Sequence, residues 1–156
     1  MIYDKINTTL GYLIVVSDGE RLSEIAFESE SSSMDVSDLK KDPTTMRPIT
    51  SQIEAYLKGE LKRFDLPLHL SGTPFQKSVW SELIKIPFGE TRSYQDIAKA
   101  VGSPSASRAV GSACGKNPVP IVVPCHRVIT KSGGLGGYSG GLGIKKTLLK
   151  IEGLSF

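Results

Sequence analysis

Cysteine, histidine and long apolar runs are scarce in this chain, and each scarcity excludes a class of protein. Only two cysteines occur in 156 residues, too few for the disulfide framework of a small secreted domain. With only two histidines, His69 and His126, and no CxxC or HExxH pattern, the sequence predicts no metal site. No apolar run approaches the roughly 20 residues of a membrane helix, and the N-terminus is a poor signal peptide. We therefore expect a soluble, cytoplasmic protein without a membrane partner.

The net charge of +3 hides an uneven distribution along the chain. Residues 1–71 contain 8 Lys or Arg against 12 Asp or Glu, a net charge of −4. Residues 72–156 contain 11 against 4, a net charge of +7. A basic half suggests a polyanionic partner such as nucleic acid, but a merely solvated lysine face explains the charge equally well.

The first domain, residues 1–71, is expected to be a scaffold that carries no chemistry. Two apolar runs, residues 10–17 and 21–28, flank an Asp-Gly-Glu turn signal and predict a β-hairpin. The polar, serine-rich residues 28–45 favour a surface loop or linker. A helix with one apolar face is predicted around residues 49–60.

The second domain, residues 72–156, is predicted to begin with a helix that runs from Pro74 until Pro87 stops it. Thr73 and Gln76 have the spacing of a capping box at its start. Its apolar stripe is predicted to consist of Phe75, Val79, Trp80, Leu83 and Ile84. We interpret Trp80 as a core residue rather than a platform for stacking a base.

Two short helices joined by a glycine-containing turn come next, a pattern typical of a helix-turn-helix. Ser93 and Asp96 form a second capping box, Gly102 ends the first helix, and Pro104 is expected to start the second. The inward face of the second helix is predicted to consist of Ala106, Ala109, Val110 and Ala113. The outward face is predicted to consist of Ser105, Ser107, Arg108 and Ser112. Small side chains around one long cation suit insertion into a groove, although a tightly packed helix with a solvated arginine has the same pattern.

Cys125 and His126 are neighbours in the proline-rich run NPVPIVVPCHRVIT, which is too rich in proline to be a helix. His126 and Arg127 place potential positive charge beside the sulfur, which favours the nucleophilic thiolate. A histidine base also needs an acid to orient it, and this half of the chain offers Glu82, Glu90, Asp96 and Glu152. The apolar flanks favour the alternative, an inert buried thiol. Because neighbouring strand residues face opposite sides, we expect His126 to act through a water.

The remaining features of this half are a lone cysteine, a glycine-rich segment and a last helix. Cys114, at the end of an alanine-rich helix, is interpreted as packing. Seven glycines between residues 133 and 143 allow close backbone approach to a ligand or a mobile loop, but match no nucleotide-binding motif. In the last helix Ile144, Leu148 and Ile151 are predicted to face inward. The lysines Lys145, Lys146 and Lys150 are predicted to lie on its other faces.

Six segments of this half, taken in order, resemble the O6-alkylguanine-DNA alkyltransferases, or methylated-DNA–protein-cysteine methyltransferases. They are FQKSVW, IPFGETRSY, SRAVGSAC, NPVPIVVPCHRVI, GGYSGG and LLKIEG. The resemblance runs from about Phe75 to Gly153, half of the chain. It implies an α+β fold with an RNase H-like N-terminal domain and a helical, winged helix-turn-helix-like C-terminal domain.

The resemblance further implies DNA repair by direct reversal of damage. Such a protein binds duplex DNA in the minor groove, flips out O6-alkylguanine or O4-alkylthymine, and transfers the alkyl group irreversibly to Cys125. Each molecule acts once, as a monomer and without a cofactor; the sequence leaves cooperative binding on DNA open.

Roles for individual residues also follow from the resemblance. Cys125 is the acceptor, His126 the base and Glu152 the acid that orients it, while Asn117 braces the cysteine turn against the recognition helix. Arg108 fills the gap left by the flipped base, and Ser105, Ser107 and Ser112 face the DNA. Tyr94 assists flipping and gives a proton to the leaving guanine, although its position beside Ile97 and Val101 also suits a core tyrosine. The base pocket is implied to consist of Tyr138, Ser139, the carbonyls of Cys125 and Val128, and Cys114.

The sequence departs from the family pattern in two respects, and two other functions remain as alternatives. No cysteine precedes Cys114, so the zinc site of some family members is not expected, and Cys114 itself could shape tolerance for the alkyl group or accept a second one. A lesion-binding protein that does not repair is one alternative, against which Cys125 argues because such proteins replace the acceptor. A cysteine hydrolase using Cys125 and His126 is the other, and it leaves the DNA-binding features unexplained.

Overall fold

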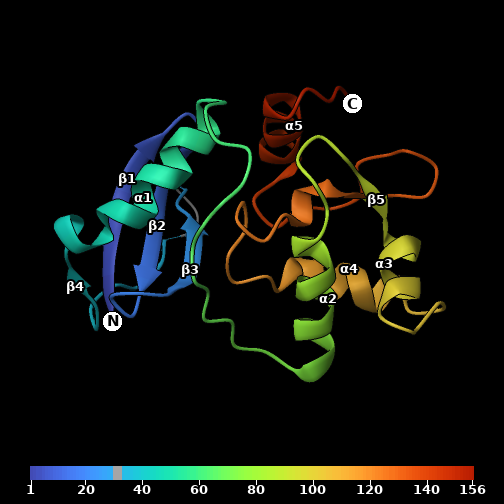
Figure 1. Cartoon of the computed structure of the whole chain (residues 1–156), viewed down its shortest axis with the longest axis horizontal. Helices are drawn as coiled ribbons and strands as arrows, with labels where there is room; N and C mark the ends of the chain where they lie inside the picture. The colour runs from blue at the N-terminus through green and yellow to red at the C-terminus, as the bar shows by residue number, and fades with distance from the viewer. Residues whose placement is uncertain (30–32) are drawn as a thin grey trace. The chain divides into compact units, whose positions relative to one another are not determined.

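The computed structural model describes residues 1–29 and 33–156, and it divides the chain into two compact units, Met1–Ser71 and Gly72–Phe156 (Figure 1). Residues 30–32 of the predicted loop lie outside the described residues. Both strands and helices are present, which confirms the predicted α+β fold class. Within the described part of the chain, no helix is long and apolar enough to cross a membrane.

A four-stranded sheet forms the first unit, in the order β3-β2-β1-β4. Its strands are β1 (Ile2–Thr8), β2 (Gly11–Ser17), β3 (Leu22–Phe27) and β4 (Lys40–Lys41). β2 pairs antiparallel with both β1 and β3, so the predicted hairpin is confirmed as β2–β3. β1, which was not predicted, contributes only Ile6 as a fully buried side chain. That weak alternation explains why it was missed.

Helix α1 (Pro43–Leu57) covers a face of this sheet, as Figure 1 shows, and packs against β1. It begins at Pro43, inside the segment predicted to be a loop, so that prediction was wrong from β4 onward. Asp42 caps the helix by accepting a hydrogen bond from the Thr45 amide at 3.1 Å, and Pro43 occupies the first turn. This start signal was overlooked because the residues before it are rich in serine.

Four helices build the second unit: α2 (Pro74–Ile84), α3 (Tyr94–Ala100), α4 (Ser107–Gly115) and α5 (Leu142–Ile151). Both predicted capping boxes are confirmed, at Thr73 with Gln76 and at Ser93 with Asp96. Trp80 is a core residue, as predicted: it is 1% exposed and its Nε1 donates to the Ala113 carbonyl of α4 at 2.9 Å. The α3–α4 pair therefore packs on α2 as one helical layer.

Three predicted details of these helices were wrong. Ile84 was expected to face inward but is 49% exposed, because α2 ends there. Pro104 lies in the turn before α4, which starts at Ser107. Ala109 is exposed rather than buried, so the inward face of α4 is narrower than the alanine pattern suggested.

A short 3-10 helix, η1 (Cys125–Arg127), contains Cys125 and His126 and leads directly into β6 (Val128–Ile129). β6 pairs in parallel with β5 (Arg92–Ser93), the strand that leads into α3. Because η1 is helical, the strand alternation expected for Cys125 and His126 does not apply. The pairing of β5 with β6 holds η1 beside the start of α3, the first helix of the α3–α4 pair.

Candidate active site

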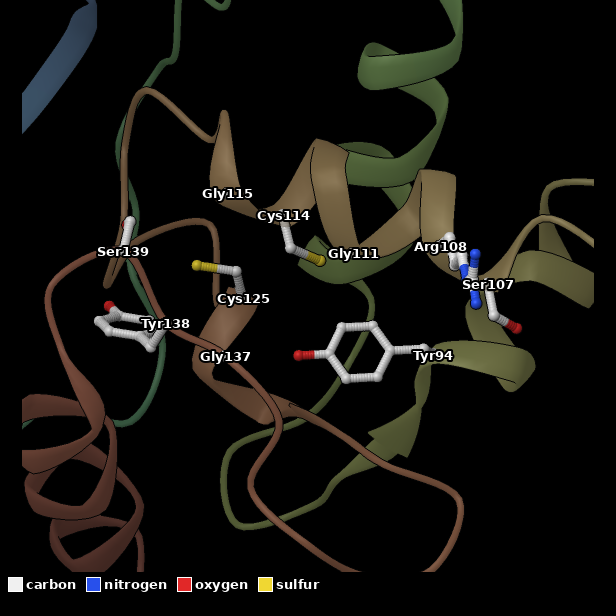
Figure 2. A pocket seen from close by; sticks show the side chains of 10 residues that line it. All are labelled: Tyr94, Ser107, Arg108, Gly111, Cys114, Gly115, Cys125, Gly137, Tyr138 and Ser139. Atoms are coloured by element: carbon white, nitrogen blue, oxygen red, sulfur yellow. The ribbon is translucent and has the colours of Figure 1, made fainter.

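A pocket of about 460 Å³ opens between α3, α4, η1 and the glycine-rich loop, all in the second unit (Figure 2). Figure 2 shows Ser107 and Arg108 at one end, Tyr138 and Ser139 at the other, and both cysteines between them. The residues that line it are Tyr94, Ser107, Arg108, Gly111, Cys114, Gly115, Cys125, Gly137, Tyr138 and Ser139. Seven of the predicted site residues are thus brought together here.

Cys125 is buried yet borders the pocket, so a ligand can reach a sulfur that bulk water barely touches. Burial raises the pKa of the Cys125 thiol, because the thiolate loses hydration. A hydrogen bond from Asn117 and the charge of Lys145 act in the opposite direction, as does a hydrogen bond from Tyr138. The resting group is therefore a thiol that needs a base before it can act as a nucleophile.

The side chain of Asn117 holds the turn that precedes η1. Its Nδ2 donates to the Val123 carbonyl at 2.8 Å, and its Oδ1 accepts from the Val119 amide at 2.9 Å. Within this turn Ile121 adopts a φ of 77°, a costly conformation for a β-branched residue. Asn117 therefore fixes a strained turn and also forms a side-chain hydrogen bond with Cys125.

His126 is not part of the pocket lining and pairs with Glu152 at the end of α5. Its Nε2 lies 2.7 Å from Glu152 Oε2, and both side chains are fully buried. Burial acts to raise the pKa of Glu152, but hydrogen bonds from His126 and Arg127 outweigh it and lower the pKa to about 2. Because Glu152 is ionised, Nε2 donates to it, and a neutral His126 then carries its lone pair on Nδ1. Of the four acids that the sequence offered, the structure selects Glu152.

Arg127 does not serve the sulfur, contrary to the prediction that its charge favours the thiolate. Its Nε donates to Glu152 Oε1 at 2.8 Å, its Nη2 to Oε2 at 3.0 Å, and its Nη1 to the Ile86 carbonyl at 2.6 Å. Gly89 adds its amide to Oε1 at 2.9 Å. Burial lowers the pKa of His126, and the charge of Arg127 lowers it further, against the pull of Glu152. The histidine is therefore held neutral and able to accept a proton.

Tyr94 and Cys114 both line the pocket. Tyr94 is half-buried, and Figure 2 shows its hydroxyl directed into the pocket from α3, so it is not simply a core tyrosine. Burial raises the pKa of Tyr94, which keeps it a proton donor at neutral pH. Burial also raises the pKa of Cys114 to about 12, so this second thiol stays protonated and weakly nucleophilic.

Besides Asn117, His126 and Glu152, three more predicted site residues lie outside the pocket lining. Ser105 and Ser112 are exposed, beside α4 and on it. Val128 is fully buried, and its carbonyl already accepts a hydrogen bond from Lys145 at 2.6 Å. In the described ranges, residues 1–29 and 33–156, no group of three or more His, Cys, Asp or Glu could hold a metal ion.

Two features of the site were not predicted. Gly111 and Gly115 form part of the α4 wall at a spacing of four residues, with Ser107 one turn before them. Lys145, predicted to lie on an outer face of the last helix, is fully buried and supplies the cation that acts on Cys125. Charged residues at helical spacing are usually solvent-facing, so the sequence did not distinguish Lys145 from the exposed Lys146 and Lys150.

Fold and site together define a class of protein: a helix pair whose second helix borders a pocket that holds a buried, activatable thiol. The family model named "6-O-methylguanine DNA methyltransferase, DNA binding domain" matches residues 74–154. The model named "6-O-methylguanine DNA methyltransferase, ribonuclease-like domain" matches residues 1–70.

Named relatives are similar in sequence to nearly the whole of this chain. A methylated-DNA--protein-cysteine methyltransferase of Methanosarcina acetivorans is 47% identical and covers 98% of this chain and 99% of its own. A constitutive methylated-DNA--protein-cysteine methyltransferase of Bacillus subtilis is 44% identical, and the match covers 99% of this chain and 96% of the relative. The crystal structure of Mycobacterium tuberculosis OGT in complex with DNA superposes with a TM-score of 0.91 at 43% identity. The match covers 97% of this chain and 92% of that one.

The chain belongs to the 6-O-methylguanine DNA methyltransferase family, which confirms the resemblance seen in the sequence. Its second unit carries the family's DNA-binding domain, so DNA is its partner.

Proposed function

We propose that this protein repairs O6-alkylguanine in duplex DNA, and O4-alkylthymine in the same way, by moving the alkyl group to Cys125. One observation carries the proposal: the acceptor sulfur borders a pocket while the buried His126–Glu152 pair, 2.7 Å apart, stands behind it, with His126 on the same 3-10 helix. The named relatives of this family support the same reaction.

Recognition of DNA is assigned to the α3–α4 pair, with α4 entering the minor groove. The outward side of α4 and the residues before it are small, apart from Arg108, which is exposed and lines the outer end of the pocket. Across the described residues Arg108 forms no ion pair with a carboxylate, so its charge is available to the DNA. We assign Arg108 to the gap that the flipped base leaves, and Ser105, Ser107 and Ser112 to the groove walls.

Flipping the lesion into the pocket costs a few kcal/mol, and an alkyl group that weakens base pairing lowers this cost. A pocket of about 460 Å³ lies within the range of sites that enclose one small ligand. Tyr138 and Ser139 line its far end, where the flipped base is expected to lie. Selection of damaged bases then comes partly from the free energy needed to unpair a normal one.

The chemistry begins when Cys125 gives its proton, through a water, to Nδ1 of His126. The thiolate attacks the alkyl carbon, a carbon–sulfur bond forms, and the carbon–oxygen bond breaks with its electron pair leaving on guanine. Tyr94 donates a proton to the guanine, and the proton held by His126 returns to Tyr94 through solvent. The product is a thioether, which thiol exchange does not reverse, so each molecule reacts once. No cofactor takes part, and all residues named come from one chain, as a monomer requires.

A titration with excess lesion tests this proposal against its alternatives. The protein is incubated with increasing equivalents of a duplex that carries O6-methylguanine, and restored guanine is counted. We expect repair to stop at one equivalent. Binding of the lesion duplex without any restored guanine would instead favour a lesion-binding protein that does not repair. Repair beyond one equivalent would rule out the suicide mechanism.

A further inference from the structure

Lys145 on α5 is a charged side chain with no access to water. It is 0% exposed, whereas Lys146 and Lys150 on the same helix are exposed. Throughout residues 1–29 and 33–156, no carboxylate lies within ion-pair distance of Lys145. An ammonium buried without a carboxylate is costly and therefore rare. Some other feature of the site must compensate for it.

The hydrogen bonds of Lys145 show which protonation state it has. Its Nζ donates to the carbonyl oxygens of Val128 at 2.6 Å, of Gly137 at 3.2 Å, and of Leu135. Three acceptors need three hydrogens, which an ammonium has and a neutral amine lacks. Burial lowers the pKa of Lys145 from its usual value, but a thiolate at Cys125 raises it again. The three carbonyl oxygens therefore bind Lys145 in its protonated, cationic form.

The same hydrogen bonds connect three parts of the site. Val128 follows η1 in β6, whereas Leu135 and Gly137 belong to the glycine-rich loop, and Gly137 lines the pocket. The Nζ also lies 5.9 Å from the ring centroid of Tyr94, which lines the pocket. Lys145 therefore ties the loop to the strand that follows the acceptor.

The charge of Lys145 has few competitors at the sulfur. Arg127 and His126, on the same 3-10 helix, both bind Glu152. α2 packs against η1 but buries no charged residue. The titratable groups that face Cys125 from the elements around it are Cys114 of α4, Tyr94 of α3, Tyr138 of the loop and Lys145 of α5. Of these only Lys145 is positive, and in a dry site its attraction for an anion is strong.

We propose that Lys145 is a positioning residue of the transfer site: its buried ammonium fixes the loop wall of the base pocket and stabilises the anionic form of Cys125. This inference rests on the proposed function for the loop's role, whereas the effect on the thiol stands without it. His126, the base, takes the proton of Cys125, and Lys145 stabilises the negative charge that remains on the sulfur.

The test measures how fast iodoacetamide alkylates Cys125 across a pH series, with the adduct located by peptide mass mapping. Lys145→Met keeps the apolar stem and removes the charge, Lys145→Arg keeps the charge, and Lys146→Met removes an exposed charge from the same helix. In Lys145→Met the pH of half-maximal reactivity should rise by about one unit, equivalent to about tenfold less thiolate near neutral pH. Lys145→Arg and Lys146→Met should retain the midpoint of the unmodified protein.

Two parallel measurements separate the possible failures. Single-turnover transfer from an O6-methylguanine duplex should slow at least about tenfold in Lys145→Met, with duplex affinity unchanged. If the unmodified protein transfers nothing, the proposed function fails, but the iodoacetamide curves still judge Lys145. An unchanged midpoint in Lys145→Met would overturn the inference.

Should Lys145→Met fail to fold by circular dichroism, the native protein provides the answer. With ¹³Cε-labelled lysine, the titration of Lys145 should move to lower pH once Cys125 has been alkylated by iodoacetamide, because the anion is then lost. Identical titrations before and after alkylation would overturn the inference.

Discussion

At the scale of single residues, the site works because each buried charge has a defined partner. Glu152 is surrounded by donors from His126, Arg127 and Gly89. That arrangement keeps the carboxylate ionised and fixes the His126 tautomer that presents Nδ1 as the base. A histidine beside the nucleophile would not be sufficient without this support.

Glu152→Gln tests this support. The amide keeps the size of the side chain but not its charge, so the tautomer of His126 is no longer fixed. We expect single-turnover transfer to slow by about 10- to 100-fold, with the affinity for the lesion duplex unchanged. Glu90→Gln, at an exposed acid paired with Arg92, is the matched control and should react like the unmodified protein. Equal rates for the two variants would contradict the role of Glu152.

The sequence pointed to Cys125 and His126 as a candidate nucleophile and base because they are adjacent in a stiff, proline-bounded run. It could not choose among four acids, since the pairing of His126 with Glu152 spans 26 residues and depends on tertiary packing. It also assigned the wrong cation. Arg127 is close to Cys125 in sequence but binds Glu152, whereas Lys145 reaches the site from α5.

At the scale of elements, the glycine-rich loop is shaped around Tyr94. Gly136 has a φ of 71°, and a Cβ there would lie 2.6 Å from the Tyr94 hydroxyl oxygen. The sequence showed that the loop could approach something closely, but it did not identify the ring that it approaches. Only the folded pocket identifies that neighbour.

Gly136→Ala should therefore displace Tyr94 and slow the transfer by about tenfold or more, an order of magnitude in keeping with misplaced catalytic groups. Gly133→Ala is the control, because Gly133 also has a positive φ of 90° but a Cβ added there would meet nothing within 4 Å. Both variants should lose about 1 kcal/mol of unfolding free energy from backbone strain. Equal transfer rates in the two would show that the contact with Tyr94 is unimportant.

Helix α4 carries the second test at this scale. Arg108→Ala should weaken repair of duplex DNA much more than reaction with free O6-methylguanine, since only the duplex leaves a gap to fill. Lys116→Ala removes an exposed charge just after α4 without touching the pocket and should change the ratio of the two rates little. An unchanged ratio in Arg108→Ala would remove Arg108 from the flipping step.

At the scale of the whole molecule, charge and stability follow the division of the chain. The second unit carries the net charge of +7 and the DNA-binding domain, whereas residues 1–71 are net negative. The starts of α2 and α3 were predictable from local capping signals. The β4 strand and the beginning of α1 were not, because serine-rich composition concealed them.

The stability of the fold should depend on Glu152 at acid pH. Its pKa is about 2 in the folded protein, below the ordinary value of 4.5, so the unfolded chain binds a proton first as the pH falls. The stabilisation is complete above about pH 4.5 and is lost as the pH approaches 2, up to about 3 kcal/mol. Urea unfolding at several pH values should show this loss in the unmodified protein and a flatter profile in Glu152→Gln. Parallel pH profiles of the unmodified protein and Glu152→Gln would contradict this contribution of Glu152 to stability.

The central claim is that one alkyl group moves from DNA to Cys125 and stays there. Peptide mass mapping after incubation with a duplex that carries O6-methylguanine measures this directly, with Cys125→Ala and Cys114→Ala as paired variants. The account predicts one methyl group per molecule, located on Cys125, retained in Cys114→Ala and absent from Cys125→Ala. A methyl group on Cys114, or guanine restored by Cys125→Ala, would contradict it.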